Sequence, residues 1–278
     1  MTSNNTEIQR TLRRADDLAM FPRVATRIRE VVDNPETSLV DLEAAVAMDS
    51  TLSAQVLKLA NSAFFGLPRS VASLNQALLI LGFQATRDTT LAIATMSIGR
   101  TEDPTRLHIW QRALRAAAAA QMFSSKIGWA GPEAFVAGML HNIGTLILLE
   151  LHPYLYEDIL HFASTPNHLV ETERTTFSFD HAQLGAAALE RWHLPERTVS
   201  AVRHHHDIQS AATITSANLP SALLWISSEL ARLTVGKDRI SPDSVAETLS
   251  VHRIAGILRL SKEELYHAAR SPTPELNP

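Results

Sequence analysis

The 278-residue chain contains no cysteine and only 10 glycines, and aromatic residues make up 6% of it. The absence of cysteine excludes disulfide bonds, cysteine-ligated zinc or iron–sulfur sites, and a thiol nucleophile. The low aromatic content and the abundance of alanine and leucine favour helix over strand. No sustained alternation of apolar and polar residues predicts a strand either. We therefore expect an all-α protein.

An excess of charge of one sign is also missing. The 25 Lys and Arg residues and 29 Asp and Glu residues give a net charge of −4, which does not favour nucleic acid or an anionic membrane as a partner. The polar start MTSNNTEIQRTLRR lacks the apolar segment of a secretory signal. Residues 134–151 are the most apolar segment, but His141, Asn142 and Glu150 interrupt it. We expect a buried helix or helix pair there, and a cytoplasmic protein.

Several local signals predict where helices begin and end. Pro132 occupies a position typical of the first turn of a helix, and Gly82 follows an apolar periodic stretch where a helix should stop. Four pairs have the capping-box spacing, in which the side chain at the helix start and the side chain three residues later cap each other's backbone N–H. These pairs are Ser38 with Asp41, Ser73 with Gln76, Asp180 with Gln183, and Ser261 with Glu264.

Histidine is the residue type with the most evident chemical potential, and 12 are present. His141 lies in the apolar segment, Asp180 and His181 lie at a predicted helix start, and residues 204–206 are three successive histidines. Imidazoles and carboxylates that converge from separate helices can hold a metal ion and activate water. The favoured alternatives are structural: His141 as a hydrogen-bonded core residue, Asp180 as an N-cap, and the three histidines as a solvated helix end.

Several segments resemble the successive blocks of the HDOD domain, the HD-related output domain of bacterial signalling proteins. Together the segments cover about Met20 to Asp207, and the order of ANSAFFG followed by LHNIG is specific. No receiver, GGDEF or kinase block flanks them, so we expect a standalone member. The segments are FPRVATRI at 21–28, AMDSTLSAQVL at 47–57, LKLANSAFFGLPRSVASLNQALLILGF at 57–83, AFVAGMLHNIG at 134–144 and FDHAQLGAAALERWHLPERTVSAVRHHH at 179–206.

The resemblance implies an all-α fold with an HD-like multi-helix core and an N-terminal helical subdomain. On this basis we divide the chain into four parts. They are an N-terminal extension (1–19), the N-terminal helical subdomain of the HDOD region (20–98), an HD-like helical subdomain (104–207), and C-terminal helices that complete the HD-like core (217–278).

The resemblance also implies positions for the metal site of HD-type phosphohydrolases, which is built from a first His, an adjacent His-Asp pair and a distant Asp. In this chain those positions correspond to Arg112, to His141 and Asn142, and to Ser228. Only His141 keeps a ligand of the pattern. An amide at 142 cannot supply the carboxylate charge that holds a hard divalent cation, and Arg112 adds positive charge where the cation would lie. We expect no catalytic residue, no metal and no cofactor.

Two functions remain open. The favoured one is a non-catalytic regulatory module that binds signalling proteins, of cyclic-di-GMP or two-component pathways as the resemblance suggests. The alternative is a residual metal-dependent phosphohydrolase or nucleotide-binding protein. It would use a polar cluster made of His141, Asp180, His181, His204 and His205. DNA binding has weak support, because the small basic cluster of Arg10, Arg13 and Arg14 is more typical of a solvated helix face.

Overall fold

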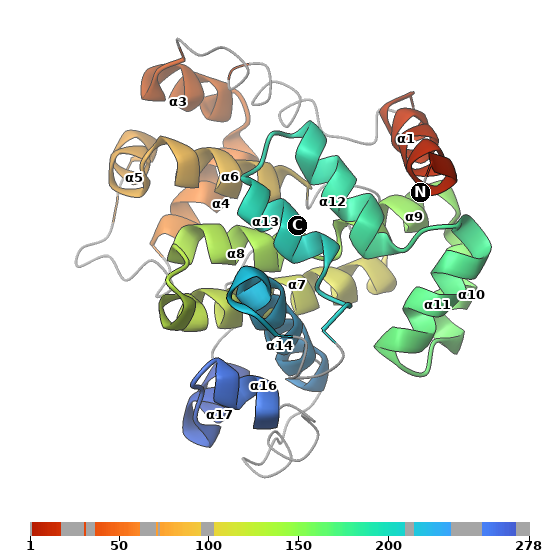
Figure 1. Cartoon of the computed structure of the whole chain (residues 1–278). Helices are drawn as coiled ribbons and strands as arrows, with labels where there is room; N and C mark the ends of the chain where they lie inside the picture. The colour runs from red at the N-terminus through yellow and green to blue at the C-terminus, as the bar shows by residue number, and fades with distance from the viewer. Residues whose placement is uncertain are drawn as a thin grey trace.

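The structure is a computed structural model, and it describes residues 2–17, 31, 37–61, 71, 73–95, 103–208, 214–234 and 252–270. Within these ranges all the regular secondary structure is helical (Figure 1). The expected all-α fold is therefore confirmed.

The N-terminal part consists of α1 and a group of short helices. In the group, α3, α4, α5 and α6 pack against one another, and α6 also packs on α8 of the following part. By contrast, α1 packs on α12. The bounds are α1 (Thr2–Asp17), α3 (Leu39–Ala47), α4 (Ser50–Ala60), α5 (Leu74–Leu81) and α6 (Phe83–Ala94).

The central and C-terminal helices form the larger part of the molecule. Helix α7 packs along α8 and α14, and α12 packs on α9 and α13 (Figure 1). The bounds of the central helices are α7 (Pro104–Phe123), the 3-10 helix η2 (Ser124–Ile127), α8 (Gly131–Leu140), α9 (Ile143–Leu151), α10 (Pro153–Phe162), α11 (Pro166–Phe177), α12 (His181–Arg191) and α13 (Glu196–Arg203). The C-terminal helices are η4 (Ser216–Asn218), α14 (Leu219–Thr234), α16 (His252–Ile257) and α17 (Lys262–Arg270).

The predicted helix boundaries agree with the structure. Reciprocal capping boxes form at Ser38, Asp180 and Ser261. The Ser73 hydroxyl accepts a hydrogen bond from the backbone N–H of Gln76 over 3.2 Å. Gly82 ends α5 with a positive φ of 79° and a ψ of 167°, so the chain turns directly into α6. Local capping chemistry therefore determines where these helices begin and end.

The apolar segment at 134–151 is a helix pair, as expected. A turn at His141 and Asn142 separates α8 from α9, and nearly every residue of both helices is buried. Residues Gly131–Leu151 are long and apolar enough to cross a membrane by length and composition alone, but 89% of this apolar stretch is buried inside the protein. Packing within the protein therefore accounts for the apolar composition.

Two glycines let this helix pair lie unusually close to its neighbours. A Cβ atom at Gly138 would lie 2.3 Å from the Cα of Ala117 on α7. A Cβ atom at Gly144 would lie 2.0 Å from the backbone carbonyl oxygen of His181 at the start of α12. Real side chains are not found so near backbone atoms. The two glycines therefore hold the His141 turn between α7 and α12.

Candidate functional site

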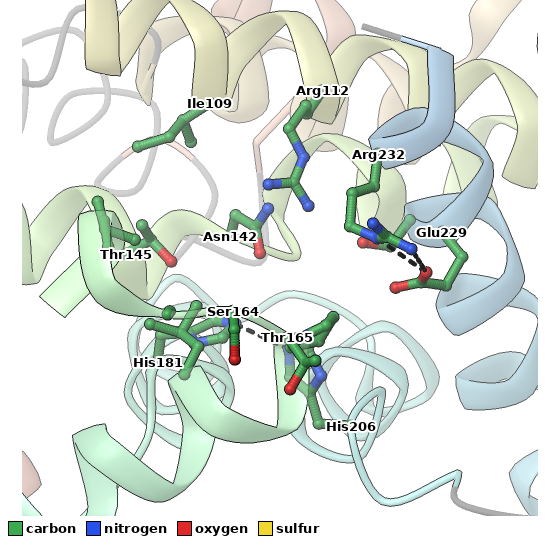
Figure 2. A pocket seen from close by; sticks show the side chains of 15 residues that line it. Ile109, Arg112, Asn142, Thr145, Ser164, Thr165, His181, His206, Glu229 and Arg232 are labelled. Atoms are coloured by element: carbon green, nitrogen blue, oxygen red, sulfur yellow. Dashed lines mark hydrogen bonds and ion pairs between the residues drawn. The ribbon is translucent and has the colours of Figure 1, made fainter.

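A pocket of about 260 Å³ lies among several central helices and α14 (Figure 2). Arg112 reaches it from α7, Asn142 from the turn between α8 and α9, and Ser228 from α14. His181 and His206 line it on another side. Three of the four positions that correspond to the HD metal site therefore meet in one pocket. The fourth, His141, is hydrogen-bonded to Ser228.

His141 is a fully hydrogen-bonded core residue with 1% of its surface exposed. Its Nδ1 lies 2.7 Å from the carbonyl oxygen of Gly138, so Nδ1 carries the proton and donates it. Its Nε2 therefore accepts from the Ser228 hydroxyl over 3.1 Å. Burial holds the pKa of His141 well below its usual value, so the ring is neutral at pH 7. Both ring nitrogens are engaged by the protein itself.

Glu173 on α11 is a buried partner of His181 that the sequence analysis missed. Its Oε2 accepts hydrogen bonds from His181 Nδ1 over 2.8 Å and from the His181 backbone N–H over 2.9 Å. The Tyr156 hydroxyl donates to its other oxygen. Its sequence neighbours Thr172 and Arg174 are polar, so no local pattern signals that a carboxylate here is buried.

The Glu173 carboxylate determines the protonation of His181. Burial lowers the pKa of His181, but the charges of Glu173 and Asp180 and the hydrogen bond to Glu173 together raise it by more, so the net shift is upward. The bond from Nδ1 to the carboxylate leaves His181 Nε2 pointing away from Glu173. This nitrogen lies 3.0 Å from His206 Nε2.

The three successive histidines point in different directions, because α13 ends at Arg203 and the chain then turns. His204 is exposed and bonds to Asp207 over 2.8 Å, so the structure places it outside the cluster that the sequence analysis proposed. His205 is buried, with Nδ1 donating to the carbonyl of Val202 over 2.6 Å. His206 contacts His181 and takes the place expected for His204.

Among the described residues, His181, His205 and His206 form a group that could hold a metal ion. One possible ligand atom from each lies within 4.8 Å of the other two. His205 Nε2 and His206 Nδ1 are buried and have no hydrogen-bond partner among the described residues. Burial lowers the pKa of His205 to about 4 and also lowers the pKa of His206, so both rings are neutral at pH 7. Three imidazoles without a carboxylate suit a softer transition metal, and His181, whose pKa is raised, would have to lose a proton to bind it.

The four HD positions do not fit the hard divalent cation of an HD-type site. They offer a guanidinium, an amide, a hydroxyl and an imidazole whose two nitrogens are already bonded.

Asp180, the carboxylate of the polar cluster predicted from the sequence, is the buried N-cap of α12. It accepts from the Gln183 backbone N–H over 2.8 Å and from Arg174 over 2.6 Å. Its carboxylate is therefore committed to the helix start, as the structural interpretation expected.

The comparisons with known proteins agree with the fold. A protein of Treponema pallidum (strain Nichols) with no described function is 26% identical over 203 residues, which is 71% of this chain and 39% of that protein. The chain thus spans about two fifths of the length of this relative. The structure of a candidate phosphohydrolase from Shewanella amazonensis SB2B superposes with a TM-score of 0.68 at 23% identity, covering 93% of this chain and 91% of that chain.

A response regulator from Methylococcus capsulatus str. Bath has the same fold, with a TM-score of 0.53 at 24% identity over 90% of this chain and 96% of that chain. The family model of the HDOD domain matches residues 18–208, close to the span from Met20 to Asp207 that the sequence analysis proposed. The chain therefore belongs to the HDOD domain family.

Proposed function

We propose that this chain is a non-catalytic signal-transduction module that acts by binding other proteins. In this proposal it derives from an HD-type phosphohydrolase that lost its metal ligands, and it works in the cytoplasm. Membership of the HDOD family and the HD-like fold support a signalling role. The response regulator that shares the fold supports partners in two-component pathways. The proposal of partners in cyclic-di-GMP pathways rests on the family resemblance alone.

The observation that carries the loss of catalysis is the pair Arg112 and Asn142 in the pocket. A cation bound there would face the positive charge of Arg112. Two unit charges about 4 Å apart repel each other by about 4 kcal/mol at an effective dielectric constant of about 20, and a divalent ion doubles this. Asn142 supplies no negative charge to offset the repulsion. Without a bound cation, the pocket lacks the Lewis acid that lowers the pKa of a bound water molecule to near neutrality in metal-dependent hydrolases.

The test is a hydrolysis assay with the purified protein. Cyclic and linear phosphodiesters and nucleoside phosphates are incubated with Mg²⁺, Mn²⁺ or Fe²⁺, and turnover is compared with a control without protein. We expect no turnover above this control. We also expect the single variant Asn142→Asp to remain inactive, because Arg112 and Ser228 would still leave the metal site incomplete. Metal-dependent turnover that His141→Ala abolishes would overturn the proposal.

A second candidate function rests on the three-histidine group. His181, His205 and His206 could hold a softer metal for a residual phosphohydrolase or nucleotide-binding activity. Under this candidate, hydrolysis or nucleotide binding would appear with Zn²⁺, Co²⁺ or Ni²⁺ and would be lost in His181→Ala. His204→Ala is the matched control, because His204 is outside the group and exposed.

A further inference from the structure

The two residues that depart most from the HD metal pattern, Arg112 and Asn142, both line the pocket and both carry hydrogen-bond donors without a partner among the described residues. Arg112 forms no ion pair or hydrogen bond with any residue that the structure describes, and its Nε is buried without a partner. The Asn142 side chain likewise bonds to none of the described residues. Buried or half-buried donors without partners are costly, so they indicate a missing acceptor.

Among the described residues no carboxylate forms an ion pair with Arg112, although the charge of Glu229 in the pocket lining acts on it and raises its pKa against the effect of burial. The other arginine of the lining, Arg232, is paired with Glu229 over 2.8 Å. Nearby, Asp180 is paired with Arg174, and Glu173 is bonded to His181. Arg112 is thus the pocket's one guanidinium without an ion pair among the described residues, and it points into the pocket (Figure 2).

The chemistry of these donors selects the ligand. The planar guanidinium of Arg112 presents its N–H groups in a fork that matches two oxygens of one anion. The Asn142 amide can donate to a third oxygen of the same group. A phosphoryl group carries three acceptor oxygens and more charge than a carboxylate, and a pocket of about 260 Å³ has room for it.

We propose that this pocket binds the phosphoryl group of a small molecule without a metal ion, with Arg112 in the place of the cation and Asn142 as a second donor. This inference rests on the proposed loss of catalysis. Replacing a carboxylate by an amide and a histidine by an arginine reverses the preference of the pocket from a cation to an anion. The ligand would then be a signal that the module senses rather than a substrate.

The experiment measures binding to the full chain by calorimetry in EDTA at constant ionic strength. The probes are inorganic phosphate, AMP as a phosphoryl group on a nucleoside, adenosine as the same nucleoside without phosphate, and acetate as a carboxylate. We expect phosphate and AMP to bind and adenosine and acetate not to bind. Tighter binding of AMP than of phosphate would identify a nucleotide as the source of the phosphoryl group, and equal binding would identify the free ion.

Three variants test the assigned residues. Arg112→Gln should weaken phosphate binding by about tenfold or more, because a charged, forked donor is lost. Asn142→Asp should also weaken it, because a carboxylate repels the anion. Arg115→Gln is the matched control on the same helix, outside the pocket lining, and should bind like the wild type. If Arg112→Gln does not fold, Arg112→Lys decides, since it keeps the charge but loses the fork and should bind more weakly than the wild type.

The outcomes separate this inference from the proposed function. Absence of phosphate binding in EDTA, or unchanged affinity in Arg112→Gln or Arg112→Lys, overturns the inference and leaves the loss of catalysis intact. Phosphate binding that requires Mn²⁺ and becomes stronger in Asn142→Asp overturns both, because the pocket would then prefer a cation.

Discussion

Asn61, at the end of α4, joins two parts of the chain through its amide. Its Oδ1 accepts from the Val71 backbone N–H over 2.6 Å, and its Nδ2 donates to the Val71 carbonyl over 2.8 Å. Because Asn61→Ala leaves both Val71 groups without this partner, we expect it to lower the free energy of unfolding by about 1–2 kcal/mol. Asn75→Ala is the control, since among the described residues the Asn75 amide makes a single solvent-exposed hydrogen bond, to the Glu43 carboxylate. Urea denaturation measures both, and equal losses would refute the role of Asn61.

His141 provides a second prediction for a single residue. His141→Ala removes two buried hydrogen bonds and leaves a cavity, so we expect a loss of about 1–3 kcal/mol in unfolding free energy. The loss should be the same with and without EDTA, because it comes from packing and hydrogen bonding. His161→Ala, at an exposed position on α10, should change stability little. A loss that appears only when metal is present would show instead that His141 is a ligand.

At the scale of helices, the close contact of α9 with α12 holds His181 in place. Gly144→Ala would place a Cβ atom 2.0 Å from the His181 carbonyl oxygen, so the two helices must move apart. We expect a loss of about 3 kcal/mol or more in unfolding free energy. Gly256→Ala is the matched control on α16, where a Cβ meets open space, and it should be neutral or stabilising by up to about 1 kcal/mol. Similar stability of the two variants would mean that α9 and α12 are not this close.

The first and last residues of helices were predictable because the capping residues lie within a few residues of the backbone groups that they bind. The capping boxes at Ser38 and Asp180 and the first-turn proline at 132 each act on adjacent backbone groups. The site was predictable only in part. Glu173 is buried because of how α11 packs, and the choice of His206 over His204 depends on a turn after α13. Neither property is encoded in neighbouring residues, so periodicity and spacing could not reveal them.

At the scale of the whole molecule, the buried histidines should make stability depend on pH. His205 has a pKa of about 4 when folded and 6.5 as the reference value, so between these values the unfolded chain binds a proton that the folded chain excludes. Unfolding free energy should therefore fall as pH drops from 6.5 to 4, by about 3 kcal/mol for His205 alone. The lowered pKa values of His141 and His206 act in the same direction.

His181 acts in the opposite direction and in a different range. Its raised pKa adds stability that is present below pH 6.5 and is lost as pH rises through the folded value. Denaturation curves in EDTA at several pH values from 4 to above 6.5 measure the net effect of these histidines on the unfolding free energy. His205→Gln should flatten the slope between pH 6.5 and 4, whereas His204→Gln, at an exposed position, should keep it. An unchanged slope in His205→Gln would show that His205 is not buried in its neutral form.

Under the proposed function, the chain folds and persists without a catalytic cation. Thermal denaturation of the purified wild-type protein with and without EDTA, together with elemental analysis for bound metal, tests it most directly. A ligand that prefers the folded state raises the melting temperature by mass action, so a resident metal would be detected as a drop on chelation. We predict no stoichiometric metal and the same melting temperature with and without EDTA. Stoichiometric metal, with an EDTA-induced drop that His181→Ala lacks, would contradict the account.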